Sequence, residues 1–81
     1  MEVSIVCFGK MREYLPEGAA GNRAELELKP DATVADAIDA LGAPRREVFA
    51  LLVDGRQAGF DEPLGEGAEV TLMPQFTGGA M

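Results

Sequence analysis

Two consecutive glycines near the carboxyl end of the sequence are the residues best suited to chemistry. They are Gly78 and Gly79, and only Ala80 and Met81 follow them. Because glycine has no Cβ and tolerates positive φ, such a pair forms a thin thread that can enter a partner's narrow channel and present a backbone carbonyl there. Glycines at a chain end are more often simply frayed. The tail hypothesis therefore needs support from the sequence upstream.

Catalysis by side chains of this chain is not favoured. The sequence has no histidine and a single cysteine, Cys7, so it can form no intrachain disulfide, Cys/His zinc site or histidine-based triad. Cys7 lies in an apolar segment, which predicts a buried structural thiol. The pairs Arg12-Glu13 and Asp61-Glu62 carry charge but form no recognisable acid/base arrangement. We expect no catalytic residue and no metal site.

The composition predicts one small acidic domain. Of 81 residues, 47% are hydrophobic and 26% charged, which suffices for a small core. Fourteen acidic and seven basic side chains give a net charge of -7, a field that repels nucleic acid and anionic lipid and favours partners with basic patches. No apolar run approaches the roughly 20 residues of a membrane span, and no secretory signal pattern opens the chain. We expect a cytoplasmic protein that binds neither nucleic acid nor membrane.

Short apolar or alternating segments, separated by glycine and proline, predict strands. Asp54-Gly55 is a hairpin-type dipeptide, and a short return strand is expected at 56–58. Asp61 to Leu64 suggests a single helical turn, and Pro74 ends the last strand. The four main strands are predicted at residues 3–8, 24–29, 48–53 and 69–73.

One helix of about ten residues is predicted after Thr33. Thr33 can cap the free amide groups, and Asp36 suits the positive end of the helix dipole. Gly42 serves as the C-cap, and Pro44 prevents continuation. Asp36 and Asp39 have no basic partner nearby in the sequence, so we expect them to form a solvated face. The residues spaced to form one apolar stripe against the sheet are Val34, Ala37, Ile38 and Leu41.

The element order β-β-α-β-(short β)-β predicts an α+β fold of the ubiquitin-like β-grasp type. One helix packs across a mixed sheet of four to five strands, and Leu51 and Ile38 share the core between them. The first and last strands then lie side by side in the middle of the sheet. We expect this domain to occupy residues 1–74 and residues 75–81 to form a flexible tail projecting from the last strand.

Five segments, in order along nearly the whole chain, resemble a known family. They lie at residues 6–13, 33–38, 53–55, 64–70 and 73–79. With these segments the chain is similar to the MoaD and ThiS group of small β-grasp sulfur carriers. Within that group it looks most similar to MoaD, the small subunit of molybdopterin synthase.

The resemblance implies a specific use of the tail. An E1-like adenylating enzyme would use ATP to form an acyl-adenylate on Gly79, and a sulfur donor would convert it to a thiocarboxylate. The large subunit of molybdopterin synthase, or another sulfur acceptor enzyme, would receive the sulfur. The chain itself would catalyse nothing and bind no cofactor. Met73 and Phe76 would dock the partner, although Met73 could instead cap the sheet edge and Phe76 could fold back on the domain.

The sequence departs from the family pattern after the second glycine. Family carriers usually end there, whereas Ala80 and Met81 move the carboxylate about 7 Å further, at ~3.3–3.6 Å per residue. A catalytic centre that needs reacting atoms about 3–3.5 Å apart does not tolerate that displacement. Some relatives are trimmed by a zinc-dependent JAMM-type peptidase. The resemblance therefore implies a precursor from which Ala80 and Met81 are removed.

Two functions of other classes remain open. A ubiquitin-like protein modifier would join the same glycine to a lysine of a target protein. A β-grasp interaction module would have no tail chemistry, and Ala80 and Met81 favour it. The receiving pathway also stays open, since molybdopterin, thiamin, cysteine and specialised metabolites all use such carriers. The oligomeric state is not indicated.

Overall fold

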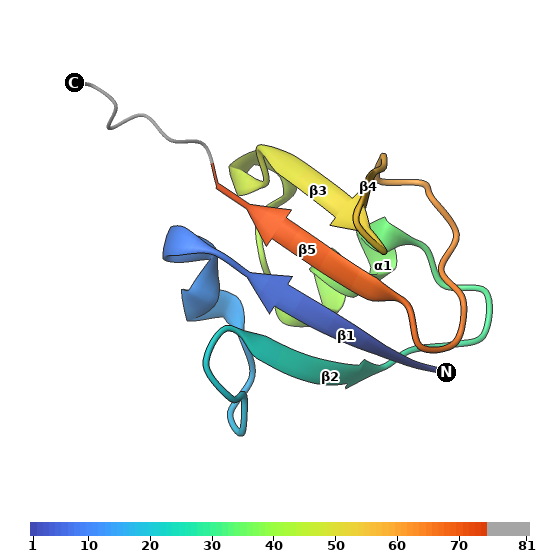
Figure 1. Ribbon diagram of the computed structural model, residues 1–81, viewed down its shortest axis with the longest axis horizontal. Coiled ribbons are helices and arrows are strands. Elements are labelled where there is room, and N and C mark those ends of the chain that lie inside the picture. The colour runs from blue at the N-terminus through green and yellow to red at the C-terminus, as the bar shows by residue number, and fades with distance from the viewer. Residues whose placement is uncertain (75–81) are drawn as a thin grey trace.

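Five strands form one mixed sheet, and an α-helix lies behind it (Figure 1). The structure is a computed structural model, and it describes residues 1–74. Within these residues, no helix has the length and apolar character needed to span a membrane. The elements are β1 (Glu2–Cys7), the 3-10 helix η1 (Gly9–Tyr14), β2 (Arg23–Glu27), α1 (Val34–Leu41), the 3-10 helix η2 (Arg45–Glu47), β3 (Ala50–Val53), β4 (Arg56–Gln57) and β5 (Glu69–Met73).

The first and last of these strands lie side by side in the middle of the sheet. The strand order is β2-β1-β5-β3-β4. β1 and β5 run parallel, with Cys7 beside Leu72, while β2, β3 and β4 each pair antiparallel with a neighbour. A parallel pair needs a long crossover, and the intervening chain with α1 provides it. The predicted α+β, ubiquitin-like β-grasp is confirmed.

Alternation along the strands gives the sheet one face toward α1 and one open face. Ile5 of β1 and Leu72 of β5 are fully buried, as is Ile38 of α1, and all three belong to one core cluster. Leu51 of β3 is in the same cluster with 5% exposure. The prediction that Leu51 and Ile38 share the core between helix and sheet is confirmed.

Cys7 belongs to this core. The side chain is fully buried, and burial raises the pKa of the Cys7 thiol to about 11. A thiol with that pKa is protonated and unreactive near neutral pH, since the thiolate is the nucleophile. The predicted structural role of Cys7 is confirmed.

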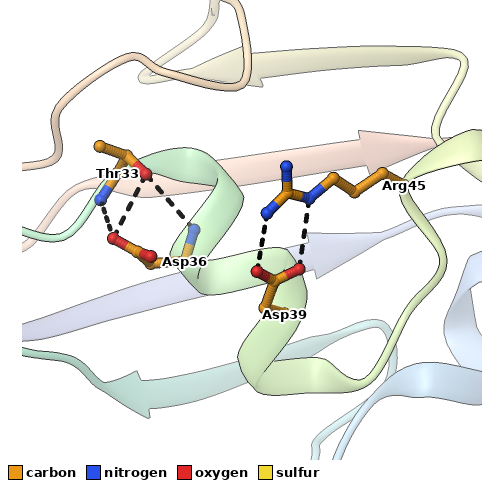
Figure 2. Close-up of polar contacts among 4 residues, drawn as sticks. All are labelled: Thr33, Asp36, Asp39 and Arg45. Carbon is orange, nitrogen blue, oxygen red and sulfur yellow. Dashed lines mark hydrogen bonds and ion pairs between the residues drawn. The ribbon is translucent and has the colours of Figure 1, made fainter.

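Reciprocal hydrogen bonds begin α1, as the sequence predicts (Figure 2). The Asp36 amide donates to Thr33 Oγ1 over 3.4 Å, and the Thr33 amide donates to Asp36 Oδ2 over 2.9 Å. The backbone hydrogen bond from Thr33 lowers the pKa of Asp36. Because the lowering occurs in the folded chain, this contribution to stability is present above the ordinary pKa of 3.8 and is lost as the pH falls through the folded-state pKa. Gly42, with φ of 77°, ends the helix in the left-handed conformation.

Asp39 has a basic partner, contrary to the expectation that it forms only a solvated face. Arg45 Nη2 donates to Asp39 Oδ2 over 2.7 Å, and Arg45 Nε donates to Asp39 Oδ1 over 3.3 Å (Figure 2). The chain reverses after Gly42, which brings the first residue of η2 back to the helix. Both side chains remain about half exposed, so the pair orients η2 more than it stabilises the fold.

Two local predictions are wrong, and one further element was not predicted. The third main strand begins at Ala50 rather than Val48, because residues 45–47 form η2 and the Val48 amide bonds to Arg45. The helical turn predicted at 61–64 is not formed: the Glu62 amide closes a turn on the Gly59 carbonyl over 3.3 Å, and Pro63 then pairs with Thr33 in an isolated bridge. The connection after β1 contains η1, which positions the fully buried Met11 in the core.

We expect Leu51→Ala to lower the free energy of unfolding by about 2–5 kcal/mol, the usual result of emptying a packed leucine site. Leu52→Ala is the matched control, because Leu52 is the next residue of β3 and lies half-buried on the open face. Partial burial predicts a loss of only about 1 kcal/mol there. Urea unfolding of the three proteins measures both effects. Equal losses at the two positions would contradict the assignment of faces.

Candidate functional site

The strand that leads into the Gly-Gly tail is held on both sides up to its last residue. Met73 ends β5 and lies opposite Ala50 of β3. On the β1 side, the Phe8 amide donates to the Leu72 carbonyl over 3.1 Å, and on the β3 side the Phe49 amide donates to the Met73 carbonyl over 2.8 Å. The carboxyl ends of β1 and β5 and the start of β3 thus meet at one edge of the sheet, from which the chain continues (Figure 1).

Apolar side chains gather at this edge. We call Phe8, Phe49, Ala50 and Met73 the tail-base surface. Phe49 and Phe8 are 66% and 42% exposed, among the most exposed large apolar side chains in the described chain, and Ala50 and Met73 are half-buried. Three of these residues are next to a core residue in the sequence, namely Phe8 after Cys7, Met73 after Leu72 and Ala50 before Leu51. Since successive side chains of a strand point to opposite faces, the three occupy the open face. The combination of exposed aromatic and apolar side chains is typical of a protein-binding surface.

Polar side chains occupy the opposite end of the open face, beyond Val6 and Leu52. Arg23 of β2 pairs with Glu69 of β5 at 2.5 Å, and the Ser4 hydroxyl of β1 donates to both carboxylate oxygens of Glu25 at 3.1 and 3.0 Å. Although carboxylates are frequent here, residues 1–74 contain no group of three or more His, Cys, Asp or Glu side chains placed to hold a metal ion. The open face is therefore divided into an apolar end, near residue 74, and a charged end.

Only one of the residues predicted for the site lies in the described part of the chain. Met73 lies in the tail-base surface, and its docking role stays a prediction. The domain boundary predicted at residue 74 also stays a prediction. The remaining predicted site residues lie outside the described residues and are Phe76, Gly78, Gly79, Ala80 and Met81.

Sequence reasoning missed two members of the tail-base surface. Phe49 sits in the most apolar run of the chain, which indicated burial, but it precedes β3 and is 66% exposed. For Phe8 the available signal is the alternation of β1, in which Cys7 faces the core and the next residue therefore faces the open side. The closeness of Phe8 to Met73 could not be read from the sequence, because it depends on the parallel register of β1 and β5.

The fold and the position of the tail define a class of protein. A helix behind a mixed sheet, with parallel terminal strands at its centre and a Gly-Gly segment following the last of them, is a ubiquitin-like β-grasp protein of the MoaD/ThiS type. The chain belongs to the Mut7-C ubiquitin family, whose model matches residues 1–79. That match includes both tail glycines and leaves Ala80 and Met81 outside it.

Solved structures agree with this assignment. SAMP1 from Haloferax volcanii is 25% identical with a TM-score of 0.74, covering 95% of this chain and 98% of its own. A second structure of the same organism's small archaeal modifier protein 1 is 23% identical with a TM-score of 0.72, covering 93% and 98%. A candidate molybdopterin converting factor, subunit 1, from Pyrococcus furiosus is 24% identical with a TM-score of 0.69, covering 93% and 98%. The last two likenesses concern the fold alone. No curated protein sequence matches the chain significantly.

Proposed function

We propose that the chain is a sulfur carrier activated at Gly79. The observation that carries the proposal is the placement of β5, whose carboxyl end leaves the centre of the sheet beside the tail-base surface. Five residues, 75–79, lead from there to the second glycine and span at most about 18 Å when extended. A partner docked on the tail-base surface can therefore receive the glycine carboxylate in a catalytic site that lies within this span of the docking surface.

The chemistry proposed for Gly79 has two steps. In the site of an E1-like adenylating enzyme, the carboxylate attacks the α-phosphorus of ATP, which forms an acyl-adenylate and releases pyrophosphate. A hydrosulfide-level sulfur nucleophile then displaces AMP and leaves a thiocarboxylate. The chain supplies the carboxylate and the surface that docks it, while ATP and all catalytic groups belong to the partner. The sulfur passes to an acceptor enzyme, for which the large subunit of a molybdopterin synthase is the candidate that the resemblance to MoaD favours.

Activation at Gly79 requires that the residues after it be removed. Ala80 and Met81 place a peptide bond where the carboxylate is needed, and amides are not adenylated. The family model ends its match at residue 79, which supports Gly79 as the working terminus. We assign the removal to a JAMM-type peptidase.

A ubiquitin-like modifier is the second candidate, because SAMP1 is described as a small archaeal modifier protein. It shares the adenylation step and differs in the acceptor, which is a lysine amine of a target protein. Sulfur carriage yields a thiocarboxylate on the free chain, whereas modification yields conjugates of higher mass. A β-grasp interaction module yields neither.

The proposal predicts that a chain shortened to end at Gly79 supports ATP–pyrophosphate exchange with its E1-like partner, and that the full chain does not. Reach is the reason, since two further residues displace the carboxylate by about 7 Å. Gly79→Val in the shortened chain should abolish exchange, because a branched Cβ prevents the close approach that glycine permits. Equal exchange by the shortened and full chains would contradict the assignment of Gly79.

The tail-base surface should contribute binding rather than chemistry. In the shortened chain, Phe49→Ala is expected to raise the KM for exchange at least about 5-fold with kcat unchanged, as for an interface residue worth more than about 1 kcal/mol. Phe60→Ala is the control, because Phe60 is also an exposed phenylalanine, at 37%, but does not belong to the tail-base surface. Its carbonyl accepts from the Ala35 amide, which places it at the start of α1. Urea unfolding checks that both variants are folded. Equal KM values for the two variants would exclude docking at Phe49.

A further inference from the structure

Gly9 and Pro74 are in direct contact where β5 ends. A Cβ built on Gly9 would lie 2.9 Å from Pro74 Cγ and 3.5 Å from Pro74 Cδ. Gly9 has φ of +54°. Among the described glycines with positive φ, it alone has a neighbouring side chain within 4 Å of such a Cβ. The lack of a side chain at Gly9 thus leaves the space that the Pro74 ring occupies.

Hydrogen bonding explains why a proline stands at this point. In the parallel register, the Phe8 amide donates to Leu72, and the Phe8 carbonyl would next accept from the amide of residue 74. Pro74 has no amide hydrogen, and the Phe8 carbonyl instead accepts from the Met11 amide over 3.0 Å, within η1. The hydrogen-bond ladder between β1 and β5 therefore ends before residue 74. There the ring of Pro74 packs against Gly9 in place of a hydrogen bond.

The contact constrains the backbone of Pro74, and not only its side chain. Pro74 is buried. Its ring is closed on its own backbone nitrogen, so a group that pushes Cγ away moves the main chain as well, apart from what a change of ring pucker absorbs. To restore an ordinary contact with a methyl group on Gly9, the ring would have to shift by about 0.5 Å.

We propose that Gly9 is a positioning residue for the tail: it seats Pro74 and so fixes the point from which residues 75–79 leave the sheet. The consequence for activity rests on the proposed function. Gly9 contacts no reacting atom and acts only through Pro74. Because a misplacement of about 1 Å can lower a rate about 100-fold, a shift of half that size at the tail base is large enough to reduce activation.

A structural role in backbone conformation alone is the competing explanation, because any L-residue at φ of +54° is strained. A comparison with Gly21 distinguishes backbone strain from contact with Pro74. Gly21 has φ of +64°, and a Cβ there meets nothing within 4 Å. Gly21→Ala therefore introduces a similar strain without touching another residue, and each alanine should lower the folding equilibrium constant about 5- to 30-fold through strain. Any additional effect of Gly9→Ala comes from Pro74.

The first measurement is the folding equilibrium constant in urea, which does not depend on activity. We expect Gly9→Ala to lower it at least about 5-fold more than Gly21→Ala does. In the Pro74→Ala background this excess should disappear, as a double-mutant cycle shows for two groups in contact. Gly9→Val and Gly21→Val repeat the comparison with a side chain too large for a change of ring pucker to accommodate. Equal losses in both pairs would overturn the proposed seat.

The second measurement is ATP–pyrophosphate exchange by chains shortened to end at Gly79. We expect Gly9→Ala to lower kcat about 10-fold relative to Gly21→Ala with KM unchanged, because the docking surface is intact and the terminus is misplaced. Pro74→Ala should remove most of that difference. A kcat within twofold of that of Gly21→Ala would overturn the positioning role even if the contact is real. If the unsubstituted shortened chain is not activated, the proposed function fails, and the folding cycle alone decides whether Gly9 seats Pro74.

Discussion

The pairing of β5 on both sides is the constraint on which the rest of the structure depends. The strand lies between β1 and β3, so its backbone is hydrogen-bonded along both edges. Its own side chains Val70 and Leu72 are fully buried in the core. Moving the end of β5 would break two ladders and open the core. The chain therefore continues toward Gly79 from a point that is itself held in place, which is what delivery of a terminus into another protein requires.

One strand thus has two roles because its side chains alternate. Leu72 enters the core against α1, and the next residue, Met73, lies on the open face beside Ala50. The fold brings Phe8, just after β1, and Phe49, just before β3, to the same edge on either side of β5. A net charge of -7 surrounds this apolar area with a field that attracts basic partners. In the proposed function, anchoring, presentation and recognition are consequently combined within a few residues.

Local sequence signals predicted those elements whose causes are local. The Thr33 and Asp36 cap, the Gly42 stop and the Asp54-Gly55 turn each depend on a few neighbouring residues, and all are present. The alternating strands and the central position of the terminal strands also followed from pattern and element order. These are the features for which propensity and packing agree.

The missed features depend on contacts between segments distant in the sequence or on turns without a strong signature. The 3-10 helices η1 and η2 have no long apolar period, and η2 removed Val48 and Phe49 from the predicted strand. The Asp39–Arg45 pair requires the reversal after α1. For the candidate site, Met73 could be proposed from its position before the tail, whereas Phe8 and Gly9 required the register of β1 against β5. The chemistry proposed at Gly79 is based on the tail sequence and the family, and Gly79 lies outside the described residues.

The intact mass of the protein purified from its own cells tests the central claim most directly. The account predicts a population that ends at Gly79, part of which carries sulfur in place of one terminal oxygen and is alkylated there by iodoacetamide. A chain that always retains Ala80 and Met81, in cells where the sulfur-requiring pathway is active, would contradict it.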